Sequence, residues 1–141
     1  TGGAGSVTVN HTVDNCAMFV REYTGYNTLD VTNSANGSNT NPNTGTVTTT
    51  VANELLVVAT GDDKSSGQTW TAAGAYGDMV GTQTTITGLS MEDNIVTSTG
   101  AQTGTLTLGG AANWEALFAS FYQAVASKNN TYKSLLGAGN I

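Results

Sequence analysis

The stretch NTGTVTTTVANELLVVAT, residues 43–60, decides the fold of this chain. Residues 46–51 are Thr and Val at every position, a composition that suits a pleated, half-exposed strand. Residues 55–59 (LLVVA) form a five-residue apolar run, and so short a run of branched side chains predicts a strand buried on both faces. The two segments, separated by a break at residues 52–54, predict the middle of a β-sandwich.

The residues before this stretch predict two strands and a long connection. Apolar and polar residues alternate over residues 6–13, which indicates a strand with one wet face. Residues 16–23 (CAMFVREY) are apolar on both faces until their end, and a turn at residues 14–15 would let the two segments pair as a hairpin. Residues 26–43 are rich in Asn, Ser, Gly and Thr, which predicts a loop or an arch between two sheets.

The residues after the central stretch predict further short strands. These cover residues 68–73 around Trp70, residues 82–87, residues 90–97 with Ile95 and Val96 buried, and residues 103–108, with loops at 61–67 and 74–81. Residues 113–126 fit an amphipathic helix, but their first part also fits a strand, so both interpretations stay open. We therefore expect one sandwich domain over residues 1–126 and a C-terminal tail or interaction arm over residues 127–141.

Composition and charge exclude several classes of partner. Only 10% of the residues are charged, the formal net charge is −6, and four Lys and Arg cannot neutralise a row of phosphates. We therefore expect no nucleic-acid partner. No window approaches the roughly 18 apolar residues that a membrane helix needs, so we expect no membrane insertion. The single Cys16 cannot form an internal disulfide.

No residue pattern predicts catalysis, a metal site or a cofactor. His11 is the only histidine, which leaves a histidine-based triad or multi-histidine metal site without its ligands. Cys16 follows the pattern of a small buried hydrophobe. A glycosidase needs only a pair of carboxylates at the right separation. The sequence does not show whether any two of these side chains meet in space. Asp62 and Asp63 stand in a Ser- and Gly-containing loop that could hold Ca²⁺, yet solvated turn acids are the preferred interpretation.

A glycan site is the binding alternative that the residue types allow. Tyr26 and Tyr76 stand in predicted loops, where an aromatic ring can stack on a sugar, while most aromatic side chains in a sandwich fill the core. Asp62 and Asp63 are the acids expected to hydrogen-bond such a glycan. Three sequons, at residues 10–12, 36–38 and 129–131, are glycosylation acceptors only in a host that modifies secreted chains.

Several segments resemble the jelly-roll-like β-sandwich modules of phage tail, capsid-decoration and bacterial surface proteins. The resemblance covers roughly residues 6–121. It rests on EYTG at 22–25, LDV at 29–31, TTTVANELLV at 48–57 and the G-x-x-x-W-x-A-x-x-A-x-F pattern at 110–121. It implies an antiparallel jelly-roll-like fold, with a short C-terminal helix or arm. The modules carry further strands before the one matched by residues 6–13, which implies that another chain or another copy supplies them.

These observations predict a protein that is not an enzyme. We expect a structural and interaction module of an extracellular assembly, such as a phage tail-fibre or capsid-decoration component, that packs against other copies or chains at an extracellular location or virion surface. Low charge fits a surface that packs against copies of itself. The alternative is a carbohydrate-binding, lectin-like module at a cell or virion surface.

Overall fold

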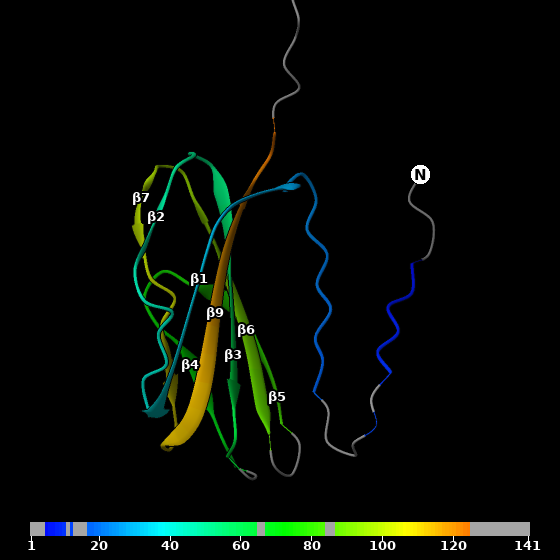
Figure 1. The fold of residues 1–141 in the computed structure, drawn as a ribbon, viewed down its shortest axis with the longest axis vertical. Helices are drawn as coiled ribbons and strands as arrows, with labels where there is room; N and C mark the ends of the chain where they lie inside the picture. Colours follow the sequence, from blue (N-terminus) through cyan, green and yellow to red (C-terminus); the bar gives the residue numbers. More distant parts are fainter. Residues whose placement is uncertain (1–4, 11, 13–16, 65–66, 84–86, 125–141) are drawn as a thin grey trace, which may run out of the picture.

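The chain folds into an all-β sandwich, as Figure 1 shows. The computed structural model describes residues 5–10, 12, 17–64, 67–83 and 87–124. One layer is a five-stranded sheet in the order β1-β9-β3-β6-β5, and the other layer holds two short pairs, β2-β7 and β4-β8. All these pairings are antiparallel, so the predicted antiparallel sandwich is confirmed. The strands are β1 (Thr28–Asn39), β2 (Val47–Thr49), β3 (Glu54–Asp62), β4 (Trp70–Ala72), β5 (Gly77–Gln83), β6 (Gly88–Val96), β7 (Gly100–Gln102), β8 (Leu106–Leu108) and β9 (Ala112–Tyr122).

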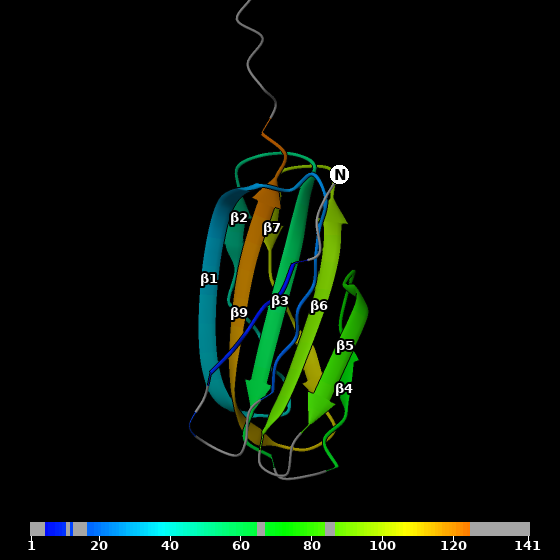
Figure 2. The ribbon, with the colours of Figure 1, turned by 90° about the vertical axis from the view of Figure 1, so that its right-hand side faces the viewer.

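Strand β3 lies at the centre of the five-stranded sheet, between β9 and β6 (Figure 2). Its residues Leu55 and Leu56 point to opposite faces, yet they are only 3% and 0% exposed. The prediction of a strand buried on both faces is therefore confirmed at this end of β3. The chain enters β3 from β2 through Asn53, whose φ of 60° is a left-handed conformation that asparagine tolerates better than most residues.

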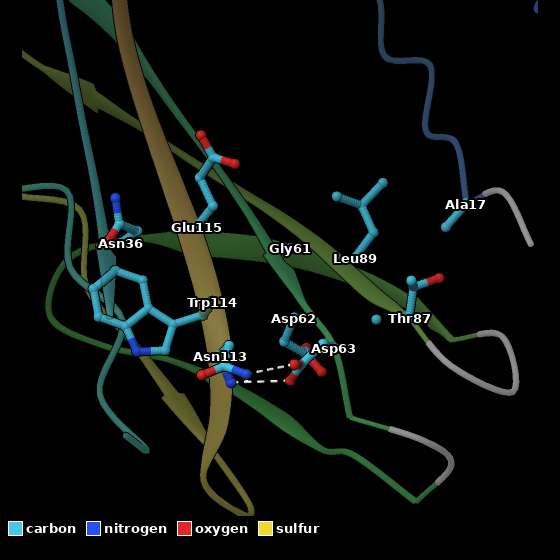
Figure 3. A pocket seen from close by; sticks show the side chains of 11 residues that line it. Ala17, Asn36, Gly61, Asp62, Asp63, Thr87, Leu89, Asn113, Trp114 and Glu115 are labelled. Carbon is cyan, nitrogen blue, oxygen red and sulfur yellow. Dashed lines mark hydrogen bonds between the residues drawn. The ribbon is translucent and has the colours of Figure 1, made fainter. Parts of the chain in front are cut away.

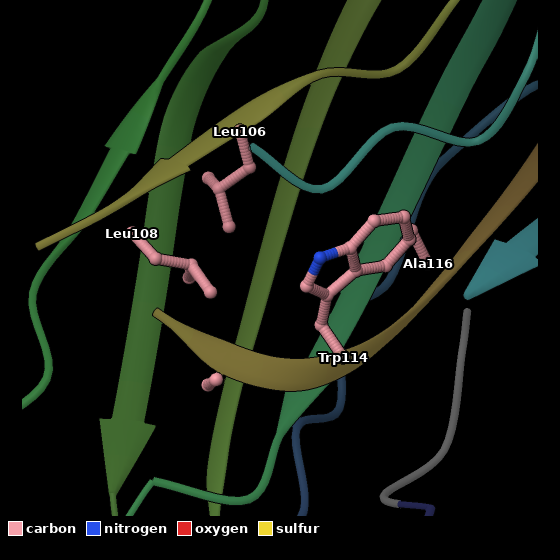
Figure 4. Packing of buried hydrophobic residues seen from close by; sticks show 5 residues of the cluster. Leu106, Leu108, Trp114 and Ala116 are labelled. Carbon is pink, nitrogen blue, oxygen red and sulfur yellow. The ribbon is translucent and has the colours of Figure 1, made fainter. Parts of the chain in front are cut away.

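The core lies between the two layers and is built on the inner face of the five-stranded sheet. Figure 4 shows one cluster, in which Leu106 and Leu108 of β8 pack against Trp114 and Ala116 of β9. The Trp114 ring lies over β1 at Gly37, where an added Cβ would come within 2.5 Å of a ring carbon. A second cluster joins buried side chains of β3 and β9: Leu56, Val58 and Phe118.

The long connection predicted for residues 26–43 is wrong, because Thr28–Asn39 is the edge strand β1. Its residues alternate between half-buried and exposed, with Asn33, Ala35 and Gly37 turned inward. Small and polar side chains suffice at a sheet edge, since β9 supplies continuous pairing partners from Thr32 to Asn39. The Asn-, Ser- and Gly-rich composition of this segment is typical of turns, but the segment is a strand.

The helical alternative for residues 113–126 is wrong for the described part, because β9 is a strand. Its buried and exposed positions alternate with period two from Ala112 to Phe118, and it is paired on both sides, with β1 and with β3. Two hydrogen-bonded neighbours override the helical spacing of its large side chains.

The hairpin predicted from residues 6–13 and 16–23 is not formed by the described residues, because 5–10 and 17–23 belong to no strand. Two other predictions fail: β5 occupies most of the loop expected at 74–81, and Ile95 is 57% exposed instead of buried. The strands predicted around Trp70 and at 90–97 are confirmed, and the end of that at 103–108 is confirmed by β8. His11, Cys16 and the arm at 127–141 lie outside the described residues.

Candidate functional site

The feature that stands out is the outer face of the five-stranded sheet, the face turned away from the β2-β7 and β4-β8 pairs. Residues on this face alternate with the core residues of each strand. A sheet face turned to solvent ordinarily carries polar side chains. On the three central strands of this sheet, however, most outer-face residues are apolar. They are Leu55, Val57 and Ala59 of β3, Leu89, Met91 and Ile95 of β6, and Leu117, Ala119 and Phe121 of β9.

An extended segment, residues 17–24, covers one half of the outer face. Figure 1 shows it beside the sheet, on the side opposite to β2 and β7. Its residues alternate, with Phe19 and Tyr23 half-buried and Met18 46% exposed. Asp93 of β6 holds the segment: Arg21 Nη1 lies 2.6 Å from Asp93 Oδ2, and the Tyr23 hydroxyl donates to the same oxygen at 2.6 Å. Side-chain contacts of Arg21 and Tyr23 with Asp93 therefore hold this segment over β6.

The other half of the outer face, over β1, β9 and β3, is bare among the described residues. An apolar groove of about 570 Å³ runs there, with Val57, Ala59, Leu117 and Ala119 in its wall and Thr32 and Ser34 at its β1 side. Leu117 is 50% exposed, which is high for a leucine in the centre of a sheet. We call this region the apolar groove.

A second hollow, which we call the Gly61 hollow, lies next to the apolar groove toward the Asp62 end of β3 and is lined by residues of β1, β3, β6 and β9. It has a volume of about 650 Å³, and Figure 3 shows Glu115 of β9, Leu89 of β6 and Ala17 around it. The absence of a side chain at Gly61 of β3 leaves the space open. Asp63 lies at its lower rim, so the two hollows together make a surface that is apolar at one end and acidic at the other.

The four residues predicted to bind a glycan do not form one site. Asp62 is the last residue of β3 and Asp63 follows it, whereas Tyr26 lies near the start of β3. The adjacent Asn27 N–H donates to Tyr122 O, and Tyr122 faces Glu54. Eight residue steps of strand separate the two ends, about 26 Å. Tyr76 packs against the inner core cluster, and its hydroxyl is buried without a hydrogen-bond partner in the described structure.

Both predicted acids have structural contacts. Asp62 is 6% exposed and accepts hydrogen bonds from Trp70 Nε1 at 3.0 Å and from the Lys64 backbone N–H at 3.1 Å. Asp63 accepts from the backbone and side-chain nitrogens of Asn113 at 2.9 and 2.6 Å, which ties the end of β3 to the start of β9. Their oxygens are therefore occupied by the sandwich itself.

Two acids that the sequence pattern does not single out, Glu54 and Glu92, are 0% and 2% exposed on the inner face. No carboxyl oxygen of either residue has a hydrogen-bond partner among the described residues. Burial raises the pKa of Glu92 to about 7, and burial together with nearby Asp30 raises the pKa of Glu54 to about 7. Burial and the charge of Glu92 raise the pKa of Tyr76 to about 12.

The two buried acids do not form a catalytic pair. In the β3–β6 register Glu92 faces Val58, four residues from Glu54, a separation of about 13 Å along the strands. Glycosidase carboxyls stand about 5 to 9.5 Å apart in a cleft open to substrate. These two side chains instead lie inside the sandwich, where their protonation affects the stability of the fold.

Neither a metal site nor a membrane helix is found in the part of the chain that the structure describes. No group of three or more His, Cys, Asp or Glu side chains converges there. The described residues also contain no helix of the length and hydropathy that a bilayer crossing requires.

Comparison with known proteins identifies no relative of this chain. No family model matches the chain, and neither the curated proteins nor the solved structures contain a significant match.

Proposed function

We propose that this chain is a non-enzymatic structural and interaction module of an extracellular assembly, in which the outer face of the five-stranded sheet packs against other copies of the chain. The observation that carries the proposal is the apolar outer face, with Leu117 50% and Ile95 57% exposed in a single copy. Contiguous apolar surface of this kind marks interaction sites in soluble proteins. Burial in an assembly would contribute about 25 cal/mol for each Å² removed from water.

The structure of the sheet edges disfavours edge-to-edge pairing between copies and so favours a face-to-face contact. Both edge strands, β1 and β5, carry a register shift against their neighbour, between Leu29 and Thr32 and between Gly77 and Val80. Such irregularities blunt a sheet edge against pairing with another chain. The flat outer face is therefore the better contact surface.

The setting of the assembly follows from the resemblance and the composition. A phage tail-fibre or capsid-decoration protein is the setting that we propose, at an extracellular location or virion surface. A chain with only 10% charged residues repels its own copies weakly, which suits repeated packing.

Sedimentation velocity and native mass spectrometry of the full chain test the proposal. We expect a multimer at micromolar concentration, and we expect Leu117→Asp to dissociate it, because a carboxylate buried in an apolar contact lacks a partner. Thr107→Asp is the matched control: it adds the same charge at an exposed β8 position in the other layer of the sandwich, and should leave the multimer intact. A wild-type chain that remains a folded monomer at high concentration would contradict the proposal.

A glycan-binding module is the second candidate, and one observation favours it. Half-buried Tyr26 lines two adjacent hollows at the Glu54 end of the sandwich, together with Tyr23 in one and Tyr122 in the other. Clustered rings of this kind can stack on sugars. Glycan-array binding that is lost in Tyr26→Ala would support this candidate, and an array without binding would remove it.

A further inference from the structure

We propose that the C-terminal residues 125–141 of a neighbouring copy bind along the bare half of the outer face, in the apolar groove and the Gly61 hollow. This inference rests on the proposed function, and it names the segment and the surface that meet. The exchange is reciprocal, so that each copy gives one segment and accepts another.

The charge of the chain is divided between these two parts. All ten acidic residues stand before residue 125, together with only two of the four basic ones. The last seventeen residues contain Lys128 and Lys133 and no acid, so this segment is basic while the rest is strongly acidic. Charge complementarity of this kind steers association and sets orientation.

The Gly61 hollow offers acidic groups for the two lysines. Glu115 is exposed and points into the hollow in Figure 3, and it has no ion-pair partner among the residues that the structure describes. Asp63 lies at the rim of the same hollow. A lysine amine beside Glu115 would neutralise a charge that the described residues leave unpaired.

The apolar groove complements the remaining side chains of the segment. The segment carries Leu135, Leu136 and Ile141, and the groove presents Leu117 and Val57. Burying leucine side chains against such a wall removes apolar surface from water and so favours association. Apolar and basic groups on the segment therefore meet apolar and acidic groups on the face.

The length of the segment is sufficient for this path. Seventeen extended residues reach up to about 56 Å. The two hollows that the segment must cover follow β9 from Ala119 to Asn113, six residue steps or about 20 Å. In a dimer with two-fold symmetry, each copy's segment would cover the bare half-face of the other copy, so that a single symmetric contact covers both faces. We therefore assign the segment to a neighbour.

Zero-length crosslinking of the full chain tests the assignment directly. A carbodiimide joins the Glu115 carboxylate to a lysine amine as an amide, with the water taken up by the reagent. In an equal mixture of ¹⁴N- and ¹⁵N-labelled chains, we expect crosslinked peptides between Glu115 and Lys128 or Lys133 that carry one label on each side. Crosslinks with the same label on both sides only would overturn binding between copies.

A charge exchange provides the second test. Glu115→Lys and the double variant Lys128→Glu/Lys133→Glu should each weaken association by about tenfold or more, since like charges then face each other. An equal mixture of the two variants should restore association, because each acceptor now meets a segment of opposite charge. The restored association should weaken at high salt, which screens exposed charges.

The outcomes separate this inference from the proposed function. A multimer that gives neither the mixed-label crosslink nor the restored association would overturn the inference and leave the proposed function standing. A monomeric wild-type chain would overturn both.

Discussion

The inner and the outer face of the five-stranded sheet carry similar side chains but differ in what covers them. The neighbouring residues Phe118 and Leu117 of β9 make the contrast clear, since Phe118 faces inward and is 2% exposed while Leu117 faces outward and is 50% exposed. The inner face is sealed by the short β2-β7 and β4-β8 pairs. Among the residues that the structure describes, the outer face is covered where residues 17–24 lie over β6.

The apolar side chains on the two faces of β9 therefore have different roles. Side chains on the inner face stabilise the fold of a single copy, because they are removed from water whenever the chain folds. Side chains on the bare outer half lose water only when another segment arrives. The same strand therefore encodes both the fold and, by our proposal, the association of copies.

The largest expected effect tests the inner face. Phe118→Ala should lower the free energy of unfolding by about 3 to 5 kcal/mol, since it leaves a cavity beside Leu56 and Val58. Leu117→Ala is the matched control and should cost below about 1 kcal/mol in dilute protein. Urea unfolding measures both, and equal losses would contradict the distinction between the faces.

The next effect concerns the charge sealed inside the inner face. Because burial raises the pKa of Glu92 from 4.5 to about 7, the folded state binds more protons than the unfolded state between these values. Stability should therefore fall as the pH rises from about 4.5 to 7, and then level off. The loss would approach about 3 kcal/mol, at 1.36 kcal/mol for each pH unit.

Glu92→Gln tests this account, because an amide has a similar shape and no charge to bury. The variant should match the wild type near pH 4 and be the more stable protein at pH 8. Urea unfolding from pH 4 to 8 measures both. An unchanged pH dependence in the variant would mean that Glu92 ionises at no cost inside the fold.

A smaller effect tests the covered half of the outer face. Asp93→Asn weakens the contacts that hold Arg21 and Tyr23, and charged hydrogen bonds of this kind contribute about 1.5 to 3 kcal/mol. Trypsin should cleave after Arg21 about tenfold faster in the variant, since local opening becomes easier. Cleavage after Lys64 serves as the internal control, and an equal acceleration there would indicate general unfolding instead.

The smallest effect concerns the turn that leads from the second layer into the sheet. Asn53→Ala should cost about 1 kcal/mol, because alanine is strained at a φ of 60°, while Asn53→Gly should change stability by less than about 0.5 kcal/mol. Thermal unfolding of the two variants measures the difference. Equal stabilities would mean that the turn adopts another conformation when residue 53 changes.

Much of the sheet could be predicted from local patterns. The branched residues of β3 and the alternation of Thr and Leu in β8 predict strands directly, because packing on those strands follows residue type. Strand β1 could not be predicted, since its Asn, Ser and Gly residues are also turn residues and only β9 makes them a strand. The large residues of β9 fit two periods, and pairing on both sides selected the strand.

The candidate surface was harder to predict than the fold. Apolar runs in β3 and β9 predict burial, but they do not say whether a second layer or another molecule provides it. Ile95 illustrates the problem, because its residue type predicts the core and its side of the strand places it outside. Likewise, Tyr26 and Asp62 share the chemistry of a glycan site, and only three-dimensional register shows that they lie at opposite ends of β3.

Hydroxyl-radical footprinting of Leu117 over a range of protein concentration tests the central claim most directly, because it reads the exposure of one side chain on the outer face. Our account predicts that oxidation of Leu117 falls as copies associate, while buried Phe118 remains unreactive throughout. Oxidation of Leu117 that stays constant from dilute to concentrated protein would contradict the claim that other copies cover this face.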